Sequence, residues 1–234
     1  MRAVIFDFFG TLTDPAAEAL RPGTFGETAA ALGVPAEAFR AAMVASFPQR
    51  IVGAFGGTRE TLRTMAHRCG AEPDDERLDH AVATHRAGAE RLRTPRRGAL
   101  AVLDHLRAQD FRLGLLSDCA SELSEAWPET VYADRIDAPV FSWREGRRKP
   151  DPRLYAVAAE RLGVPAAECW FVGDGGGREH DGARRAGMRP VLVTNAAYPG
   201  APGMRVDPDT YLPEHRIDEL DELIRLLGTA CDNG

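Results

Sequence analysis

The sequence has no hydrophobic run long enough to cross a membrane, and its N-terminus lacks the pattern of a secretory signal peptide. A formal net charge of −6 over 234 residues gives no electrostatic reason to bind nucleic acid or an anionic membrane. The four cysteines are widely spaced and fit neither a zinc site nor a small disulfide framework: Cys69, Cys119, Cys169 and Cys231. We therefore expect a soluble globular protein of the reducing cytoplasm, with neither nucleic acid nor a membrane as partner.

Lysine is almost absent. Of the 29 basic residues, only Lys149 is lysine, and all the others are arginine. A codon bias toward arginine explains the general excess, but it does not explain why one position kept lysine. Because the arginine head is a wide planar fork and the lysine head a compact charge, a tight site beside a carboxylate can accept lysine alone. Lys149 is therefore a candidate functional residue.

The chain begins with a short apolar run that ends in an acid. Residues 4–6 are apolar, Asp7 follows them, and Gly10-Thr11 is a turn signal. This pattern predicts a buried strand that delivers Asp7 to the edge of a sheet. Residues 14–93 then show helical periodicity with no convincing strand, which predicts an insert of about four helices. The core would consist of residues 1–13 and 94–234.

From Pro95 onward, helices and strands alternate. The apolar runs predict strands at 111–118, 139–143, 169–174 and 190–194. The amphipathic stretches predict helices at 98–109, 152–162, 178–186 and 217–227, and a proline-rich loop is expected at 196–214. Strict alternation implies right-handed crossovers and a parallel sheet with helices on both faces. The predicted fold class is α/β, with a Rossmann-like core and an inserted all-helical domain.

Three predicted strands end in polar residues, namely Asp7, Ser117-Asp118 and Asp174, and Lys149 directly precedes a predicted helix. Each residue alone has an ordinary explanation: a strand-end Asp often caps a turn, and the glycines after Asp174 are often only a flexible turn. In a parallel sheet, however, the strand ends meet at one edge. Neighbouring carboxylates repel each other, so such a site favours a divalent cation and an ammonium group. A carboxylate paired with lysine can act as a nucleophile, and Ser117 could hold the oxygens of a transferred phosphoryl group.

Four motifs carry a family resemblance. They are Asp7-Phe8-Phe9-Gly10-Thr11-Leu12, then Leu115-Leu116-Ser117, then Lys149-Pro150-Asp151-Pro152, and finally Val172-Gly173-Asp174-Gly175-Gly176-Gly177-Arg178-Glu179 with Gly182-Ala183. In this order they resemble the motifs of the haloacid dehalogenase-like hydrolase superfamily, in its subfamily with a helical cap, over essentially the whole chain. Each motif alone is weak, but the single lysine falls on the third.

The resemblance implies a role for each matching residue. Asp7 would be the covalent nucleophile, and Ser117 and Lys149 would bind the transferred group. Gly10, Thr11 and Asp118 would complete the phosphate-binding set. Mg²⁺ would be bound by Asp7, Asp174 and the main-chain carbonyl of Phe9, with Glu179 orienting a metal-bound water. The insert at 14–93 would be the cap that selects a small-molecule substrate. Together these roles imply Mg²⁺-dependent hydrolysis of a phosphate ester through an aspartyl-phosphate intermediate.

The sequence departs from the family pattern at Phe9. Phosphatases of this superfamily usually carry an Asp there, which protonates the leaving group, and phenylalanine cannot transfer a proton. The loss of general acid–base help typically costs a factor of about 10² to 10⁴ in rate. In a first hypothesis the protein is still a phosphatase, and its acid comes from elsewhere, with four candidates: His67, His80, His85 and Asp118.

Two further hypotheses stay open. The protein could be a 2-haloacid dehalogenase, because those relatives also have a non-acidic residue at the position of Phe9. They place a tyrosine near Tyr155, although packing of its helix is the commoner role, and Arg40 or Arg50 could hold a carboxylate. The presence of Asp174 weighs against this hypothesis, because dehalogenases replace that metal-binding acid. The third hypothesis is a non-catalytic relative that binds a small ligand.

Overall fold

The centre of the fold is a parallel sheet in which the N-terminal strand is an inner member. The computed structural model of the chain describes residues 2–198, 200 and 206–229. Six strands pair in the order β3-β2-β1-β4-β5-β6, and every pairing is parallel. The strands are β1 (Ala3–Phe6), β2 (Arg112–Ser117), β3 (Ala138–Phe141), β4 (Cys169–Gly173), β5 (Arg189–Val193) and β6 (His215–Ile217). The predicted α/β fold with a Rossmann-like sheet is confirmed.

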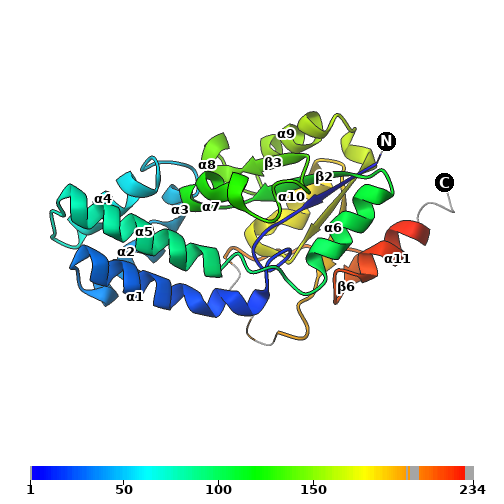
Figure 1. The fold of residues 1–234 in the computed structure, drawn as a ribbon. Helices are drawn as coiled ribbons and strands as arrows, with labels where there is room; N and C mark the ends of the chain where they lie inside the picture. The colour runs from blue at the N-terminus through cyan, green and yellow to red at the C-terminus, as the bar shows by residue number, and fades with distance from the viewer. Residues whose placement is uncertain (1, 199, 201–205, 230–234) are drawn as a thin grey trace.

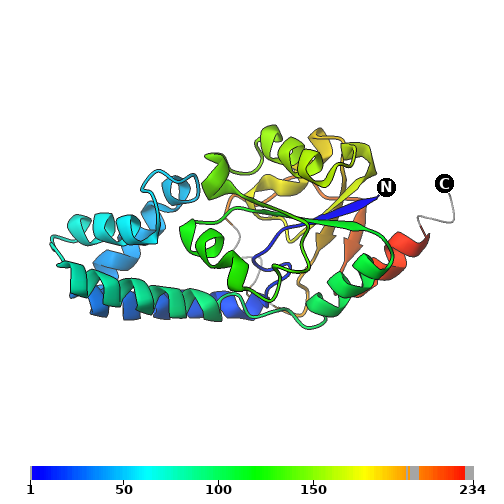
Figure 2. The same cartoon turned by 45° about the horizontal axis from the view of Figure 1, so that its top comes forward.

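Helices cover both faces of this sheet, as Figures 1 and 2 show. Successive side chains of a strand point to opposite faces, so Val4 and Phe6 of β1 pack with one set of helices and Ala3 and Ile5 with the other. The first set includes α6 (Ala99–Ala108) and α11 (Glu222–Thr229). The second set includes α9 (Pro152–Leu162) and α10 (Glu179–Arg185). Because both faces are covered, the strands are apolar throughout.

Between β1 and α6 the chain forms a helical insertion, residues 15–91, which extends to the left of the sheet in Figure 1. Its elements are a 3₁₀ helix (Pro15–Leu20), α1 (Arg21–Leu32), α2 (Ala36–Ala45), α3 (Phe47–Arg50), α4 (Thr58–Arg68) and α5 (Asp75–Arg91). The insertion has its own apolar core, which includes Phe25, Phe39, Leu62 and Leu78. The chain leaves and returns at one place, where Thr13 and Pro95 form an antiparallel bridge.

The structure differs from the sequence prediction in several elements. The edge strand β6 was not predicted, and the helix expected from residue 217 begins only at Glu222. The strand expected at 139–143 ends at Phe141, because the next residues form the short helix α8 (Ser142–Glu145). The insertion contains five α-helices rather than about four, since α3 has only four residues. Part of the loop expected at 196–214, including Pro199 and Pro202, lies outside the described residues, as does Cys231.

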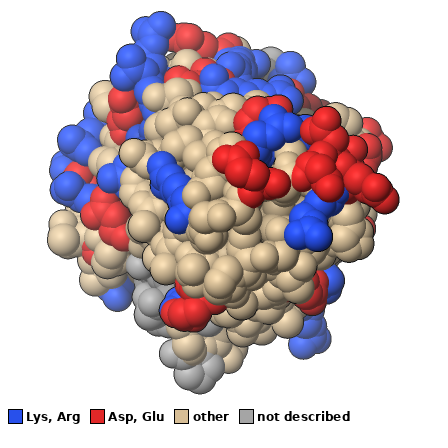
Figure 3. Space-filling model, turned by 90° about the vertical axis from the view of Figure 1, so that its left-hand side faces the viewer, with Lys and Arg blue, Asp and Glu red and all other residues tan. Residues whose placement is uncertain are grey.

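The other short helices of the described core are α7 (Ser121–Ala126) after β2 and 3₁₀ turns at 127–129, 166–168 and 176–178. Among the described residues, no helix is long and apolar enough to cross a membrane. Figure 3 shows the end of the molecule formed by the insertion, where acidic and basic side chains alternate around a broad area with few charges. The ion pairs of Arg59 with Asp75 and Asp79 belong to this mixture of charge on the insertion.

Candidate active site

The carboxyl ends of three neighbouring strands bring the predicted polar residues together. In the sheet, β1 lies between β2 and β4, with Phe6 opposite Leu115 on one side and Val172 on the other. Asp7 continues this register, because its backbone N–H donates to the carbonyl of Val172 over 2.8 Å. Ser117 ends β2 and Asp174 follows β4. The sheet therefore places Asp7 between the second and fourth motifs, as its strand-end position predicts.

Lys149 joins two carboxylates of this site. Its Nζ lies 2.7 Å from Oδ1 of Asp7 and 2.6 Å from Oε2 of Glu179, and all three side chains are buried. Burial alone disfavours the charged lysine, but Asp7 and Glu179 outweigh it and hold the pKa of Lys149 well above its ordinary value. For Glu179, burial and the nearby Asp7 raise the pKa although Lys149 opposes the shift. The hydroxyl of Thr11 donates to Oδ2 of Asp7 over 3.2 Å, so both oxygens of Asp7 are held.

The side chains of Asp7, Asp174 and Glu179 form the cluster that fits a metal. Each offers a carboxylate oxygen, and these oxygens lie within 4.8 Å of one another. The backbone N–H of Gly175 holds Oε1 of Glu179 over 2.8 Å, and that of Gly176 holds Oδ1 of Asp174 over 3.1 Å. Hard oxygen donors and excess negative charge suit Mg²⁺.

The main-chain carbonyl of Phe9, the fourth expected ligand, accepts no hydrogen bond from the described part of the chain. A carbonyl without a donor is free to bind a cation, so the donor set fits Mg²⁺. Glu179 was expected to orient a metal-bound water, but both of its carboxylate oxygens already have partners, Lys149 and Gly175. In this structure, Glu179 holds Lys149 and the loop after β4 in position.

The remaining predicted residues lie beside this cluster. Ser117 is fully buried beside the cavity wall without forming part of it, and its Oγ has no hydrogen-bond partner among the described residues. The carboxylate of Asp118 accepts from the backbone N–H of Lys149 over 3.0 Å. Burial raises the pKa of Asp118 to about 6, although Lys149 opposes the shift. Asp118 can therefore exist as an acid near neutral pH.

Of the four alternative proton donors, only Asp118 lines the cavity beside Asp7. His67 is exposed and pairs with Glu72, and His80 lines a different surface groove. His85 is buried inside the insertion, where its Nδ1 lies 3.1 Å from the hydroxyl of Thr28. Of these four candidates, Asp118 is therefore the one that lies beside Asp7.

Tyr155, the residue that dehalogenases would place near the reaction, is buried in the core below the site. Its hydroxyl donates to the main-chain carbonyl of Glu179 over 2.9 Å, and the side chain is not part of the cavity wall. A β-carbon on Gly182 would lie only 2.4 Å from that hydroxyl, so helix α10 packs tightly on Tyr155. Packing of its helix is therefore its role here.

Two residues of the site were missed by the sequence analysis. Asn195, which follows β5, donates from Nδ2 to the carbonyl of Gly10 over 3.0 Å. Arg96 is fully buried and donates to Oδ1 of Asn195 and to the carbonyl of Asp218, the latter over 2.9 Å. Asn195 has the same signal as the other site residues, a polar side chain at a strand end. Arg96 has none, since it is one arginine among many.

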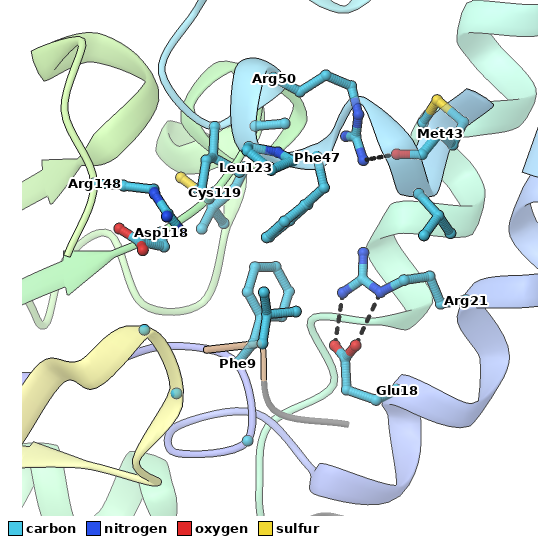
Figure 4. Close-up of a pocket in the computed structure, with 18 of the residues that line it drawn as sticks. Phe9, Glu18, Arg21, Met43, Phe47, Arg50, Asp118, Cys119, Leu123 and Arg148 are labelled. Atoms are coloured by element: carbon cyan, nitrogen blue, oxygen red, sulfur yellow. Dashed lines mark hydrogen bonds and ion pairs between the residues drawn. The ribbon is translucent and has the colours of Figure 1, made fainter. Parts of the chain in front are cut away.

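A cavity of about 650 Å³ lies between these strand ends and the helical insertion. Its inner end is formed by Asp7, Lys149 and Asp174. Most of its wall is apolar, and Figure 4 shows the rings of Phe9 and Phe47 pointing toward one another in its middle. The apolar wall comprises Phe9, Phe25, Met43, Val44, Phe47, Ile51 and Leu123. The charged groups farther from Asp7 include Glu18, Arg21, Arg40, Arg50, Glu122 and Arg148.

Phe9 stands in the cavity where a phosphatase would have its acid. The guanidinium carbon of Arg21 lies 5.4 Å from the centre of the Phe9 ring, and Arg21 itself pairs with Glu18 over 2.8 Å. Arg40 is half-exposed and pairs with Glu37, whereas Arg50 is buried. The cavity therefore has a carboxylate-rich inner end and an apolar, partly cationic outer end.

Comparisons with known proteins agree on the family of this chain. A family model described as haloacid dehalogenase-like hydrolase matches residues 1–187. A glyceraldehyde 3-phosphate phosphatase of Methanopyrus kandleri is 28% identical over 178 residues, covering 75% of each chain. The (S)-2-haloacid dehalogenase 4A of Burkholderia cepacia is 27% identical over 241 residues, which cover 97% of this chain and 95% of that protein.

The fold comparison agrees. The crystal structure of a 2-haloacid dehalogenase from Pseudomonas syringae superposes with a TM-score of 0.69 at 25% identity, over 98% of this chain and 99% of that one. Several further relatives match over only about half of their own length. The relatives therefore include both phosphatases and dehalogenases, and the chain is similar to both.

Proposed function

This chain belongs to the haloacid dehalogenase-like hydrolase family, and we propose that within it the protein is a Mg²⁺-dependent hydrolase of a small phosphomonoester. The observation that carries the proposal is the carboxylate cluster, in which Asp174 lies within 4.8 Å of Asp7 and Glu179. A metal-independent nucleophile gains nothing from further carboxylates beside it, because like charges repel. A metal-dependent one needs them as ligands.

In the proposed reaction, an oxygen of Asp7 attacks the phosphorus, and the bond between the phosphorus and the ester oxygen breaks. The leaving alkoxide takes up a proton, and an aspartyl-phosphate remains. Water then attacks this phosphorus, which releases inorganic phosphate and restores the carboxylate of Asp7. Lys149, whose Nζ lies 2.7 Å from Asp7, compensates the charge of the attacking carboxylate, and Ser117 at the end of β2 donates its hydroxyl to an oxygen of the transferred group. Mg²⁺ held by Asp7, Asp174 and the Phe9 carbonyl would supply charge neutralisation.

We assign the missing proton transfer to Asp118. It lines the cavity beside Asp7, and its pKa of about 6 lets it hold a proton near neutral pH. An acid with a pKa near the working pH is the effective proton donor. Phe9 excludes water from the same end of the cavity. The helical insertion serves as the cap that closes the cavity and selects the substrate. The free Cys69, Cys119 and Cys169 are compatible with a reducing cytoplasm as the setting.

C–halogen hydrolysis is the second candidate, and two observations favour it. Halide needs no proton as it leaves, so Phe9 is no handicap, and the dehalogenase relatives match over almost their whole length. Asp174 distinguishes the two candidates. In the phosphatase it would be a Mg²⁺ ligand, whereas in a metal-independent dehalogenase its charge would only repel Asp7.

The test is a panel of phosphomonoesters and 2-haloacids, assayed for phosphate and halide release with Mg²⁺ and with EDTA. We expect phosphate release that disappears with EDTA and in Asp7→Asn. The matched control is Asp134→Asn, an exposed acid distant from the cavity wall, which should keep full activity. Halide release without metal would overturn the proposal in favour of the dehalogenase. Ligand binding without any turnover would favour the non-catalytic relative.

A further inference from the structure

Arg50 is a buried cation at the outer end of the cavity. It ends helix α3, its residue is only 6% exposed, and it forms part of the cavity wall. Its Nη2 donates to the carbonyl of Met43 over 3.0 Å, and its Nε to the hydroxyl of Ser46 over 3.3 Å. These two contacts hold the edge of the guanidinium that carries Nε and Nη2 against the end of helix α2. Its Nη1 donates to no residue in the described ranges 2–198, 200 and 206–229.

No described carboxylate lies within ion-pair distance of this guanidinium. Glu122, which also lines the cavity, acts on Arg50 through its charge but lies beyond 4.0 Å, whereas Arg21 repels it. Burial lowers the pKa of Arg50, and Glu122 only partly opposes that shift. Buried charges in proteins are usually paired, because an uncompensated one loses its hydration without replacement.

The other arginines of the cavity are already neutralised or are not buried. Arg21 makes a two-bond contact with Glu18, over 2.8 and 2.9 Å. Arg40 pairs with Glu37 and is half-exposed. In Figure 4 the rings of Phe9 and Phe47 lie between Asp118 on one side and Arg50 with Arg21 on the other. Arg50 thus combines burial, an unused donor edge and a position across an apolar wall from the reacting end.

We propose that Arg50 binds a second oxyanion on the substrate, at the end of the molecule opposite the phosphoester. This inference rests on the proposed function. The substrate would carry an ester phosphate at Asp7, an apolar middle against Phe9 and Phe47, and a carboxylate or second phosphate at Nη1 of Arg50. The planar guanidinium suits either oxyanion, since both offer oxygens that accept its parallel N–H donors.

The test measures binding rather than turnover, so it does not depend on the reaction. The protein is Asp7→Asn with Mg²⁺, titrated calorimetrically with three series of alkyl phosphates of increasing chain length. One series ends in a carboxylate, one in a second phosphate and one in a hydroxyl. At the best chain length we expect an oxyanion to bind about tenfold tighter than the hydroxyl, as for one charge-assisted hydrogen bond.

In Arg50→Met this preference should disappear while the affinity for the hydroxyl series stays unchanged, which also shows that the variant is folded. Arg50→Lys should keep part of the preference, because it retains a cation. The control Arg63→Met removes an exposed arginine of the insertion that pairs with Asp75, and should change nothing. The two oxyanion series decide whether the second group is a carboxylate or a phosphate.

Equal affinity for all three series in the protein with Arg50 intact would overturn the inference, however the variants fold. It would also be overturned if Arg40→Met, and not Arg50→Met, abolished the preference. Failure of the proposed function gives a different result: the oxyanion preference would persist in binding, while the protein with intact Asp7 would release no phosphate from any of the three series.

Discussion

Replacing Lys149 by methionine gives the sharpest test of the charge arrangement. The ammonium lies 2.7 Å from Asp7 and 2.6 Å from Glu179, and all three groups are buried. Methionine fills a similar volume, so the main change is the loss of the charge that compensates two carboxylates. Removal of one partner from a buried ion pair typically costs about 3–5 kcal/mol. We expect a loss of that size in the free energy of unfolding at pH 8, measured by urea denaturation without metal.

The loss should depend on pH in a defined direction. Burial and the nearby Asp7 already raise the folded-state pKa of Glu179 above its unfolded value of about 4, and without the ammonium the opposing effect of Lys149 is lost. The folded state then binds more protons than the unfolded state between these values, so stability falls as the pH rises through that window. At pH 5 Glu179 can be protonated, and the loss should shrink to about 1 kcal/mol, the size of an ordinary substitution.

The control is Arg147→Met, two residues away. Arg147 is exposed and pairs with Asp151 over 2.8 Å, so its loss should change stability by less than about 1 kcal/mol. Mg²⁺ should stabilise Lys149→Met more than the unmodified protein, because it neutralises the same carboxylates. If Lys149→Met is as stable as the parent at pH 8, the carboxylates do not depend on the ammonium, and the reasoning is refuted.

Three further predictions concern the reaction and its loop. Phe9→Asp should raise kcat on alkyl phosphates by about 10² or more and kcat on aryl phosphates less, since only a poor leaving group needs the acid. If the ratio of kcat on alkyl to kcat on aryl phosphates is unchanged, the lack of an acid at Phe9 does not limit the reaction. The kcat of the parent should fall as the pH rises through about 6, where Asp118 loses its proton. In Asp118→Asn this fall should be absent from the pH profile. If it persists in the variant, Asp118 is not the proton donor. Asn195→Gly leaves the Gly10 carbonyl and Arg96 each short of one partner, so urea denaturation should show a loss of about 1–3 kcal/mol and titration a weaker Mg²⁺ affinity.

The parts of the fold that were predictable are those with strong local signals. Continuous apolar runs gave five of the six strands, because a strand buried on both faces needs apolar side chains throughout. The edge strand β6 escaped because His215–Ile217 is too short to show a pattern and only Ile217 is buried. Helix α3, only four residues long and with Pro48 in its first turn, likewise has too little periodicity to be counted.

The site residues that directly follow strands were predictable from the sequence, whereas those that come together only through tertiary packing were not. Asp7 and Asp174 follow strands, and their meeting at one edge is a property of parallel sheets. The buried arginines Arg50 and Arg96 carry no such signal, because a chain with 28 arginines gives no reason to choose between them. Their importance comes from the loss of solvent around them, which only the folded chain shows.

The glycine-rich loop after β4 lies against the single lysine, Lys149, and against Glu179. A β-carbon on Gly173 would lie 2.1 Å from Oε1 of Glu179, so no other residue leaves room for that carboxylate. Gly177 has a φ of +64°, in the left-handed region that favours glycine, and a β-carbon there would lie 3.2 Å from Oδ2 of Asp118 and 3.4 Å from Cβ of Lys149. The guanidinium of arginine is wider than an ammonium and needs more space at the end of the side chain. Gly173 is therefore required by the space that Glu179 occupies and Gly177 by its backbone conformation, and the carboxylates and the loop around Lys149 favour the compact ammonium over the wider guanidinium.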